Sequence, residues 1–346
     1  MSGLKNKNEV FNYIQNNCNE LFGPSFIATK NNLKFDYNVF NDQEIKKIIS
    51  KFGDIKQTKI LYLSSYKPNY TRTETLLDLF KRNKIEYKSI ITGKQKFKYI
   101  KLIWNLILNQ NKYDIIFVAF RGHEILPFIK LFARKPIIYD AFISIYDTIC
   151  FDRQIIKPQS IIGKLLKWYD IFLCKISDYI LLDTKTHRQY FIDEFNILEN
   201  KIGYLYVGCN EKMFKPIKVK KDPNKFVIFW YGNSFPLQGV DNILKAAKKL
   251  EKYPNILFRL VGPVRQKHQK LVDKLKLKNV QFIDWVPYEK LPLEIAKADL
   301  CLGGHFSTIP KATRVVPGKV FQFLACGQPT LIASNEANLE LFNKNK

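Results

Sequence analysis

Three cationic side chains stand close together in the C-terminal third of the sequence, beside a pair of glycines. Lys311, Arg314 and Lys319 follow Gly303–Gly304, and the last of them opens a predicted helix over 319–326. Cations beside free backbone amides at the start of a helix suit the binding of a pyrophosphate group. A solvated basic loop is the competing interpretation, although such a loop has no need of the glycines.

Two further features point to the same chemistry. Gln322 lies one turn into the predicted helix, where its amide could bond a sugar hydroxyl. A loop from Gly232 to Gly239, which contains Asn233 and Gln238, follows a buried strand and opens another helix. Its glycines allow backbone amides to approach a phosphate. The loop lacks G-x-G-x-x-G spacing, so an ordinary turn explains it equally well when it is taken alone.

The elements that must position these residues are short apolar runs alternating with longer helical patterns. This alternation predicts parallel sheets flanked by helices. The predicted strands are 59–64, 87–92, 114–119, 136–139, 179–182, 202–206, 225–231, 257–261, 280–282, 300–302 and 330–333. The clearest predicted helices are 74–83, 240–251 and 319–326.

The strand-first pattern restarts near residue 225, which predicts two Rossmann-like domains. Gly208, Asn210 and Pro216 interrupt the periodicity just before that point, and interruptions of this kind mark linkers. We therefore expect an N-terminal extension at 1–57 joined to the N-terminal domain, an N-terminal Rossmann-like domain at 58–207, and a C-terminal Rossmann-like domain at 208–346.

The composition restricts the classes of partner. The 346 residues carry 56 Lys and Arg against 31 Asp and Glu, a net charge of +25. Such a field suits nucleic acid, an anionic membrane surface or a phosphorylated small molecule, and many of the lysines could equally be solvated surface. No helix-turn-helix, zinc or RNP pattern supports a specific nucleic-acid partner.

The cysteines and the N-terminus indicate the compartment. The six cysteines are scattered singly and lack metal-ligand spacing, as expected of a protein in a reducing compartment without a metal site. The start of the sequence has no apolar signal run, and no stretch reaches the roughly 18 apolar residues of a membrane span. We expect a cytoplasmic protein.

Four segments of the C-terminal half, in their order and spacing, resemble the donor domain of group 1 retaining glycosyltransferases. They are YGNSFPLQGVDNILKAA, FRLVGP, VQFIDWVPYEKLPLEIAKADLCLG and KATRVVPGKVFQFLACGQPTLIAS. The resemblance covers about residues 226–341. It implies an α/β protein of the GT-B fold, with two Rossmann-like domains facing across a cleft, and a nucleotide-diphosphate sugar as substrate with no cofactor.

The resemblance also implies roles for individual residues in binding the donor. The implied positions are Gly232, Asn233, Gln238 and Gly239 in the phosphate loop, Gly262 at the nucleoside, Trp285 and Val286 flanking the base, Gly304 and His305 facing the sugar, Lys311, Arg314 and Lys319 at the phosphates, and Gln322 at the ribose. The chain has no D-x-D pair. Cations in place of a metal ion fit metal-independent transfer, in which the main task is to stabilise the departing diphosphate.

Three departures from the family pattern motivate an alternative. Arg314 and Gln322 stand where the family has glutamates, and Gln238 stands where it often has a basic residue. The sequence ends at Lys346, soon after the last predicted strand, so the C-terminal domain is expected to be incomplete. The alternative is a GT-B nucleotide-sugar-binding protein with impaired catalysis; a nucleotide-sugar epimerase is a minor option.

The acceptor is expected to meet the N-terminal domain. His123 and Asp140 follow predicted strands and could take or orient the acceptor proton, although a helix-start residue and a cap are the simpler interpretations. The loop 66–73, which contains Arg72, is a further candidate lining. The acceptor class we expect is a cell-surface polysaccharide, lipopolysaccharide or glycolipid precursor.

Two N-terminal stretches, 94–108 and 161–175, mix lysines with aromatic and aliphatic residues. A basic amphipathic helix can lie on an anionic leaflet, whereas a core-facing helix with a basic outer face is the more common outcome. We expect peripheral contact with the inner leaflet of the membrane, which would bring the protein to a lipid-linked acceptor.

Overall fold

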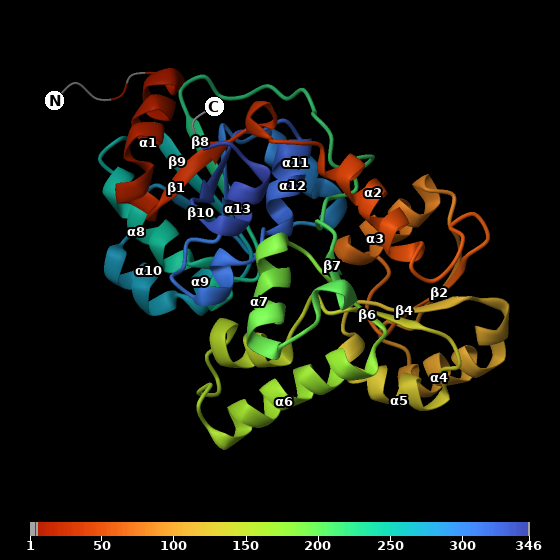
Figure 1. Ribbon diagram of the computed structural model, residues 1–346. Coiled ribbons are helices and arrows are strands. Elements are labelled where there is room, and N and C mark those ends of the chain that lie inside the picture. Colours follow the sequence, from red (N-terminus) through yellow and green to blue (C-terminus); the bar gives the residue numbers. More distant parts are fainter. Residues whose placement is uncertain (1–3, 5, 345–346) are drawn as a thin grey trace. The chain divides into compact units, whose positions relative to one another are not determined.

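The computed structural model describes Leu4 and residues 6–344, and the chain forms two compact units (Figure 1). Unit 1 comprises the residues up to Lys34 together with those from Cys209 onward, and unit 2 comprises Phe35–Gly208. Each unit contains a six-stranded sheet with flanking helices. The prediction of an α/β protein with two Rossmann-like domains is confirmed.

Unit 2 is built on parallel strands in the order β3-β2-β4-β5-β6-β7. Near-continuous apolar runs form these strands because both faces of the sheet are covered. The strands are β2 (Lys59–Ser64), β3 (Glu86–Ile91), β4 (Ile115–Val118), β5 (Ile137–Asp140), β6 (Tyr179–Leu182) and β7 (Ile202–Tyr204). Each lies within two residues of its predicted bounds.

The helices of unit 2 cover both faces of this sheet. Ile60 and Tyr62 pack in one core with α2 (Tyr37–Ile49) and α3 (Thr71–Arg82). Leu61 and Leu63 point to the other face, as the two-residue period of a strand requires. The core on that side includes four helices: α4 (Lys98–Asn109), α5 (Leu126–Phe132), α6 (Ile161–Ile176) and α7 (Lys185–Phe195).

Unit 1 has the strand order β1-β12-β11-β8-β9-β10, in which every pairing is parallel except that of β1 with β12. In the antiparallel pair, Ser25 lies opposite Ala333. The strands are β1 (Ser25–Ala28), β8 (Phe226–Tyr231), β9 (Ile256–Val261), β10 (Val280–Ile283), β11 (Leu300–Gly304) and β12 (Thr330–Ala333).

The sheet of unit 1 also carries helices on both faces. Ile228 and Trp230 belong to a core formed with α1 (Lys7–Phe22), α8 (Val240–Leu250), α9 (Val264–Lys267) and α10 (Gln269–Leu275). Phe229 points the opposite way and meets Phe323 of α12 (Gly318–Ala325), with ring centroids 6.1 Å apart. The remaining helices are α11 (Leu291–Ala296) and α13 (Glu336–Leu341).

The expected extension over residues 1–57 does not form one piece joined to the N-terminal domain. Ile14 and its apolar neighbours on α1 lie in the core of unit 1, and Lys7 pairs with Asp299 at 2.9 Å. Strand β1 then completes the sheet of the same unit. Ile45 and Ile48 on α2 instead lie in the core of unit 2. The segment is divided because its two helices bury their apolar stripes in different cores.

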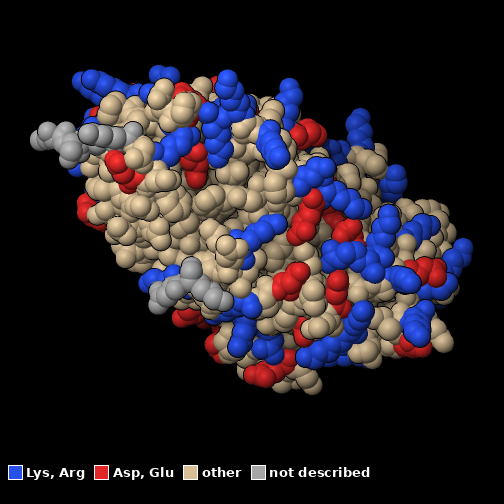
Figure 2. All heavy atoms as spheres, turned by 90° about the horizontal axis from the view of Figure 1, so that it is seen from above, with Lys and Arg blue, Asp and Glu red and all other residues tan. Residues whose placement is uncertain are grey.

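Two features are relevant to membrane contact: the length and apolar character of the described helices, and the charge of the surface. None of the described helices combines the length and the apolar character needed to cross a bilayer. The face drawn in Figure 2 carries more Lys and Arg than Asp and Glu side chains, in keeping with the net charge of +25.

Candidate functional site

The strand order of unit 1 places a ligand-binding position at the carboxyl end of β8. From β8 the chain proceeds to β9 and β10 on one side and then returns to β11 on the other side. The strands β8 and β11 are neighbours, and the loops that follow them lead away in opposite directions. In open α/β sheets, ligands bind in the crevice between two such loops, at the switch point of the strand order. The loop 232–239 and the segment 304–319, both singled out in the sequence, follow these two strands.

Lys319 is the central cation of this position. It lies in the first turn of α12, 8% exposed, with its ammonium 2.8 Å from the Tyr231 carbonyl and 2.6 Å from Oε1 of Gln238. The ammonium also sits 4.4 Å from the centre of the Trp230 ring. Burial lowers the pKa of Lys319 to about 7. The site thus holds a cation whose proton is easily lost until a negative charge stabilises it.

His305 and Lys311 lie close to this cation. His305 follows β11 and is 7% exposed, and among the described residues its buried Nδ1 has no hydrogen-bond partner. Burial, reinforced by the charges of Lys319 and Lys311, lowers its pKa to about 3. Its imidazole is therefore neutral at physiological pH and can exchange hydrogen bonds with a hydroxyl. Lys311 is buried in the short turn η8 (Pro310–Thr313).

Gln322 lies one turn further along α12 and joins two tyrosines. The Tyr231 hydroxyl donates to its Oε1, and its Nε2 donates to the Tyr288 hydroxyl at 3.2 Å. Gln322 is 3% exposed. Neither tyrosine was identified from the sequence. Tyr231 lies 91 positions from Gln322 and Tyr288 lies 34 positions from it, so only the tertiary fold brings them together. The network fixes the amide orientation at the side of the site predicted to meet a ribose.

The glycines of this region allow loops to approach one another closely. A Cβ on Gly262 would lie 2.0 Å from the Gly232 carbonyl oxygen, and one on Gly239 would lie 2.3 Å from the Phe306 carbonyl carbon. Both glycines have positive φ, 122° and 65°. Glycine is required at both positions for backbone packing. Phosphate or nucleoside contact, the roles implied for them, remains a proposal.

A hydrogen-bonded chain fixes the loop after β8 and was also missed from the sequence. The Ser234 hydroxyl lies 2.8 Å from Nε2 of His268, whose Nδ1 lies 2.6 Å from Asp241. Ser234 is 4% exposed and has a φ of +54°. The burial of its hydroxyl makes this arrangement a support for the loop rather than a nucleophile.

The other predicted donor residues occupy varied places. Gly304 is buried at the end of β11 and Arg314 is half-buried at the end of η8. The Asn233 side chain is exposed, and its carbonyl accepts from Lys267. Trp285 is 76% exposed, with the half-buried Val286 beside it. An exposed indole does not form a base-binding wall by itself.

In unit 2, Asp140 lies at the carboxyl end of β5 and is held by Arg72. The guanidinium of Arg72 approaches the carboxylate at 3.1 and 3.4 Å and also donates to the carbonyls of Leu182 and Leu205. Burial raises the pKa of Asp140, and the charge of Arg72 opposes that shift. The expectation of an acceptor base here is wrong, because both carboxylate oxygens are engaged in a buried ion pair. Arg72 is likewise inside the unit and does not line a site.

His123 lies in η3 (Gly122–Glu124), which begins four residues after the end of β4. Burial lowers its pKa to about 4, so the imidazole is neutral and able to accept a proton. Its neighbour Glu124 was not singled out from the sequence, yet it pairs with Arg121 and with Lys98. Although burial opposes ionisation, a hydrogen bond from Tyr99 and these cations hold the pKa of Glu124 below its usual value. His123 thus remains a candidate for proton transfer beside a charged cluster.

The C-terminal segment of the chain is similar to a known family. Residues 211–346 match the family described as glycosyl transferases group 1. Over 238 residues the chain is 26% identical to a chitobiosyldiphosphodolichol beta-mannosyltransferase of Debaryomyces hansenii, covering 60% of this chain and 49% of that protein. Over 123 residues it is 32% identical to WcaI of Escherichia coli K12, named for glycosyl transfer in colanic acid biosynthesis, covering 34% and 28%. The matches span 28% to 62% of the length of these curated relatives.

Solved structures share the fold over most of the chain. HepE of Anabaena, in complex with UDP-glucose, superposes with a TM-score of 0.56 at 15% identity over 82% of both chains. Sucrose-phosphate synthase of Thermosynechococcus elongatus has the same TM-score at 12% identity, over 79% of this chain and 80% of that one. This likeness establishes the GT-B fold.

Proposed function

We propose that this chain, whose residues 211–346 match the group 1 glycosyltransferases, transfers a sugar from a nucleoside diphosphate donor to a hydroxyl acceptor. The observation that carries the proposal is the buried Lys319, which meets neutral oxygens and no carboxylate among the described residues. A buried cation without a counter-ion costs folding free energy. An anionic ligand at the switch point would offset that cost.

The reaction joins the acceptor oxygen to the anomeric carbon while the bond from that carbon to the donor diphosphate breaks. The diphosphate leaves with the electron pair, and the acceptor proton passes to a base or to the departing phosphate. Lys319 and Lys311 would stabilise the charge that develops on the diphosphate. The neutral His305 would bond a sugar hydroxyl, and Gln322 would bond the ribose.

Two details of this reaction are proposed from the family resemblance and the cations. Retention of anomeric configuration follows from the resemblance to retaining enzymes and is checked by NMR of the product. Metal independence is proposed because the buried Lys311 and Lys319 would stabilise the charge of the leaving group in place of a metal ion. Transfer that survives EDTA would support it, and loss of transfer that Mg²⁺ restores would contradict it.

We place the acceptor at a membrane surface, as a polysaccharide or glycolipid precursor. Consecutive helices of unit 2 leave large apolar side chains exposed, including Trp104 at 61%, Leu131 at 77% and Trp168 at 60%. Helix α4 contacts α5, and α5 contacts α6, so these side chains lie on one helical layer. Exposed lysines on the same helices complement an anionic leaflet. Two named relatives, a glycosyl transferase of a diphosphodolichol-linked substrate and one of colanic acid synthesis, support this class of acceptor.

Co-sedimentation with vesicles tests the membrane contact. We expect binding to vesicles that contain phosphatidylglycerol and weaker binding to pure phosphatidylcholine. The triple change Trp104→Ser, Leu131→Ser and Trp168→Ser should reduce it at least fivefold. The surface changes Lys274→Ser and Lys56→Ser are the control, because they also replace exposed side chains but lie outside the helical layer. Equal binding by the triple variant and the unchanged protein would exclude this helical layer as the contact.

Calorimetric titration with UDP-, GDP- and ADP-sugars tests the donor site. We expect one nucleotide to bind, and Lys319→Met to weaken that binding at least tenfold. Lys274→Met is the matched control, because Lys274 is exposed on α10 of the same unit. Undiminished binding by Lys319→Met would contradict the proposed site. Binding without transfer or hydrolysis would favour the alternative of a nucleotide-sugar-binding protein with impaired catalysis.

A further inference from the structure

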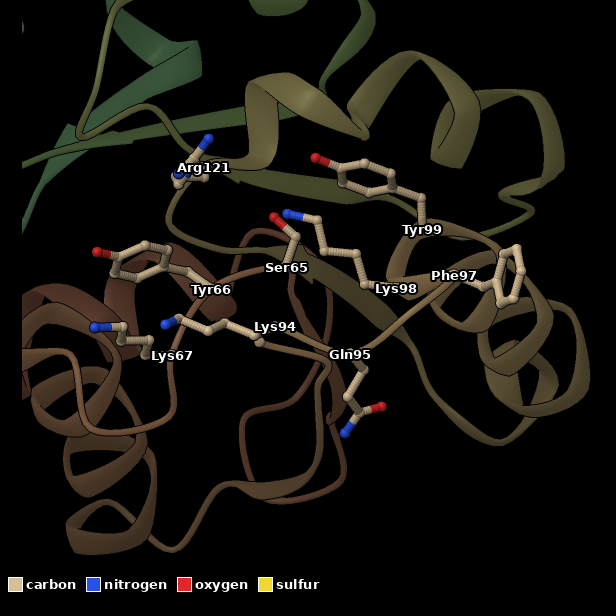
Figure 3. Close-up of a pocket in the computed structure, with 10 residues that line it drawn as sticks. Ser65, Tyr66, Lys67, Lys94, Gln95, Phe97, Lys98, Tyr99 and Arg121 are labelled. Atoms are coloured by element: carbon tan, nitrogen blue, oxygen red, sulfur yellow. The ribbon is translucent and has the colours of Figure 1, made fainter.

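Unit 2 has a cavity at the carboxyl ends of β2, β3 and β4. It has a volume of about 650 Å³, and its walls include Tyr66, Lys67, Lys94, Lys98, Tyr99 and Arg121 (Figure 3). These residues come from the three loops that follow those strands and from the first turn of α4. Four of them are cations, and the donor chemistry of unit 1 uses none of them.

The strand order places this cavity at a second switch point. From β2 the chain moves to β3 on one side and then to β4 on the other. The crevice between the loops after β2 and β4 is the position where open α/β sheets bind ligands. It corresponds within unit 2 to the position that Lys319 and His305 occupy in unit 1. The cavity therefore lies where the topology predicts a ligand.

The charges in the cavity are only partly compensated. Glu124 pairs with Arg121 and, at 3.6 Å, with Lys98, and it also accepts from Ser65 at 3.2 Å and from Tyr99 at 2.6 Å. One carboxylate thus serves two of the four cations.

The side chains of Lys67 and Lys94 are exposed and form neither an ion pair nor a hydrogen bond with the part of the chain that the structure describes. Figure 3 shows both extending to the same side of the cavity, near the Tyr66 ring. Two ammonium groups on the same side of a cavity suit a group with several anionic oxygens, such as phosphate or diphosphate.

An apolar stripe begins at the same place. Phe97, Ile100, Trp104 and Leu108 follow one another at three- and four-residue spacing on and beside α4, with 76%, 65%, 61% and 58% of each side chain exposed. Residues at this spacing lie on one side of a helix. Phe97 also lines the cavity. The stripe extends from the cations along a helix about 18 Å long, so an amphiphile with a phosphate headgroup could meet both.

We infer that this cavity binds the phosphate or diphosphate group of the acceptor substrate. The cations hold the anionic oxygens, while Glu124 keeps Arg121 and Lys98 in place. The α4 stripe meets the apolar part of a lipid-linked ligand. The assignment to the acceptor rests on the proposed transferase function, whereas the anion site itself does not.

Inorganic pyrophosphate is the probe for the anion site. It is titrated by calorimetry into the full chain carrying Lys319→Met, so that the donor position contributes less to the signal. We expect saturable binding that weakens at least tenfold when Lys67→Ala and Lys94→Ala are added. Lys56→Ala with Lys81→Ala is the matched control, because these exposed lysines lie in the same unit, near the amino ends of β2 and β3. The control pair should change the affinity less than twofold.

Three outcomes are informative. Absence of pyrophosphate binding, or an equal loss in the control pair, overturns the inference. Nucleotide binding by the chain without these changes is measured in parallel and reports on the proposed function separately. Farnesyl diphosphate distinguishes the sources of the anion. Tighter binding than pyrophosphate, lost in Trp104→Ser with Leu108→Ser, identifies a lipid-linked ligand, and equal affinity identifies a soluble phosphate compound.

Discussion

Arg72 of unit 2 and Lys319 of unit 1 are both buried near the carboxyl ends of strands, and these two cations have opposite surroundings. Arg72 of unit 2 is 1% exposed and meets the Asp140 carboxylate and two backbone carbonyls. Lys319 of unit 1 is 8% exposed and, among the described residues, meets the neutral oxygens of Tyr231 and Gln238 without any carboxylate. The two side chains are thus similarly buried, but the charge of Arg72 is balanced by a carboxylate and the charge of Lys319 is not.

This difference separates a structural role from a ligand-binding role. Arg72 joins the ends of β5, β6 and the segment after β7, so its charge stabilises the fold through hydrogen bonds that a lysine could not all make. Lys319 contributes a desolvation cost, which lowers its pKa to about 7. A buried charge that the fold does not compensate marks the position where a ligand of opposite charge is expected.

The largest expected effect is on the stability of unit 2. Arg72→Met leaves the Asp140 carboxylate buried and unpaired, and we expect the free energy of opening to fall by about 3–5 kcal/mol. Hydrogen exchange of the β5 and β6 amides measures it. The double variant Arg72→Met with Asp140→Leu should recover most of the loss, because no uncompensated charge remains. A cost below about 1 kcal/mol for the single change would remove the contrast with Lys319.

Lys319→Met should reduce activity rather than stability, in contrast to Arg72→Met. The rate constant kcat/KM for transfer is expected to fall about 100-fold, the usual effect of removing one group that stabilises a developing charge. The melting temperature should stay level or rise, because a desolvated charge is removed. Lys274→Met should change neither quantity. A loss of stability comparable to that of Arg72→Met would show that Lys319 also has a structural role.

The pH dependence of nucleotide binding sharpens the same point. With a pKa of about 7 in the free protein, Lys319 is increasingly neutral above that pH. A bound diphosphate favours the ammonium and raises its pKa, so binding above pH 7 must take up a proton. The dissociation constant should then rise by up to about tenfold per pH unit.

Calorimetry at pH 8.5 in two buffers of different ionisation enthalpy should show uptake approaching one proton, and at pH 6.5 much less. Lys319→Arg keeps its charge throughout this range and should abolish the dependence. His305, with its pKa lowered to about 3, contributes nothing above pH 6. Uptake that persists in Lys319→Arg would assign the proton to another group.

The sheets could be predicted closely from the sequence because parallel strands covered on both faces are continuous apolar runs. KILYLS and FVIFWY have this character, and both end where predicted. Strand β1 was missed because it has four residues, lies at a sheet edge and pairs antiparallel with a strand some 300 positions later. Helix α1 was missed because asparagines interrupt its apolar stripe.

The candidate site could be predicted where its residues are close in sequence. Lys311, Lys319 and Gln322 lie near one segment, with a helix start to mark it. Tyr288 was not identified from the sequence, because only the fold brings its hydroxyl to the amide of Gln322. Asp140 was misjudged for the same reason, since its partner Arg72 lies 68 positions earlier and the sequence alone gives no sign of their pairing.

The smallest expected effect tests the division of the N-terminal segment between the units. Ile14 on α1 and Ile45 on α2 are both fully buried, one in the core of unit 1 and the other in that of unit 2. Each Ile→Val change removes one methyl group and should cost about 0.5–1.5 kcal/mol. Ile14→Val should speed hydrogen exchange in β8 and β12, and Ile45→Val should speed it in β2 and β4. Each variant is the control for the other. If Ile14→Val loosened β2 and β4 as much as β8 and β12, the two units would not open independently, and the effects of Arg72→Met and Lys319→Met would have to be analysed as properties of one cooperative fold.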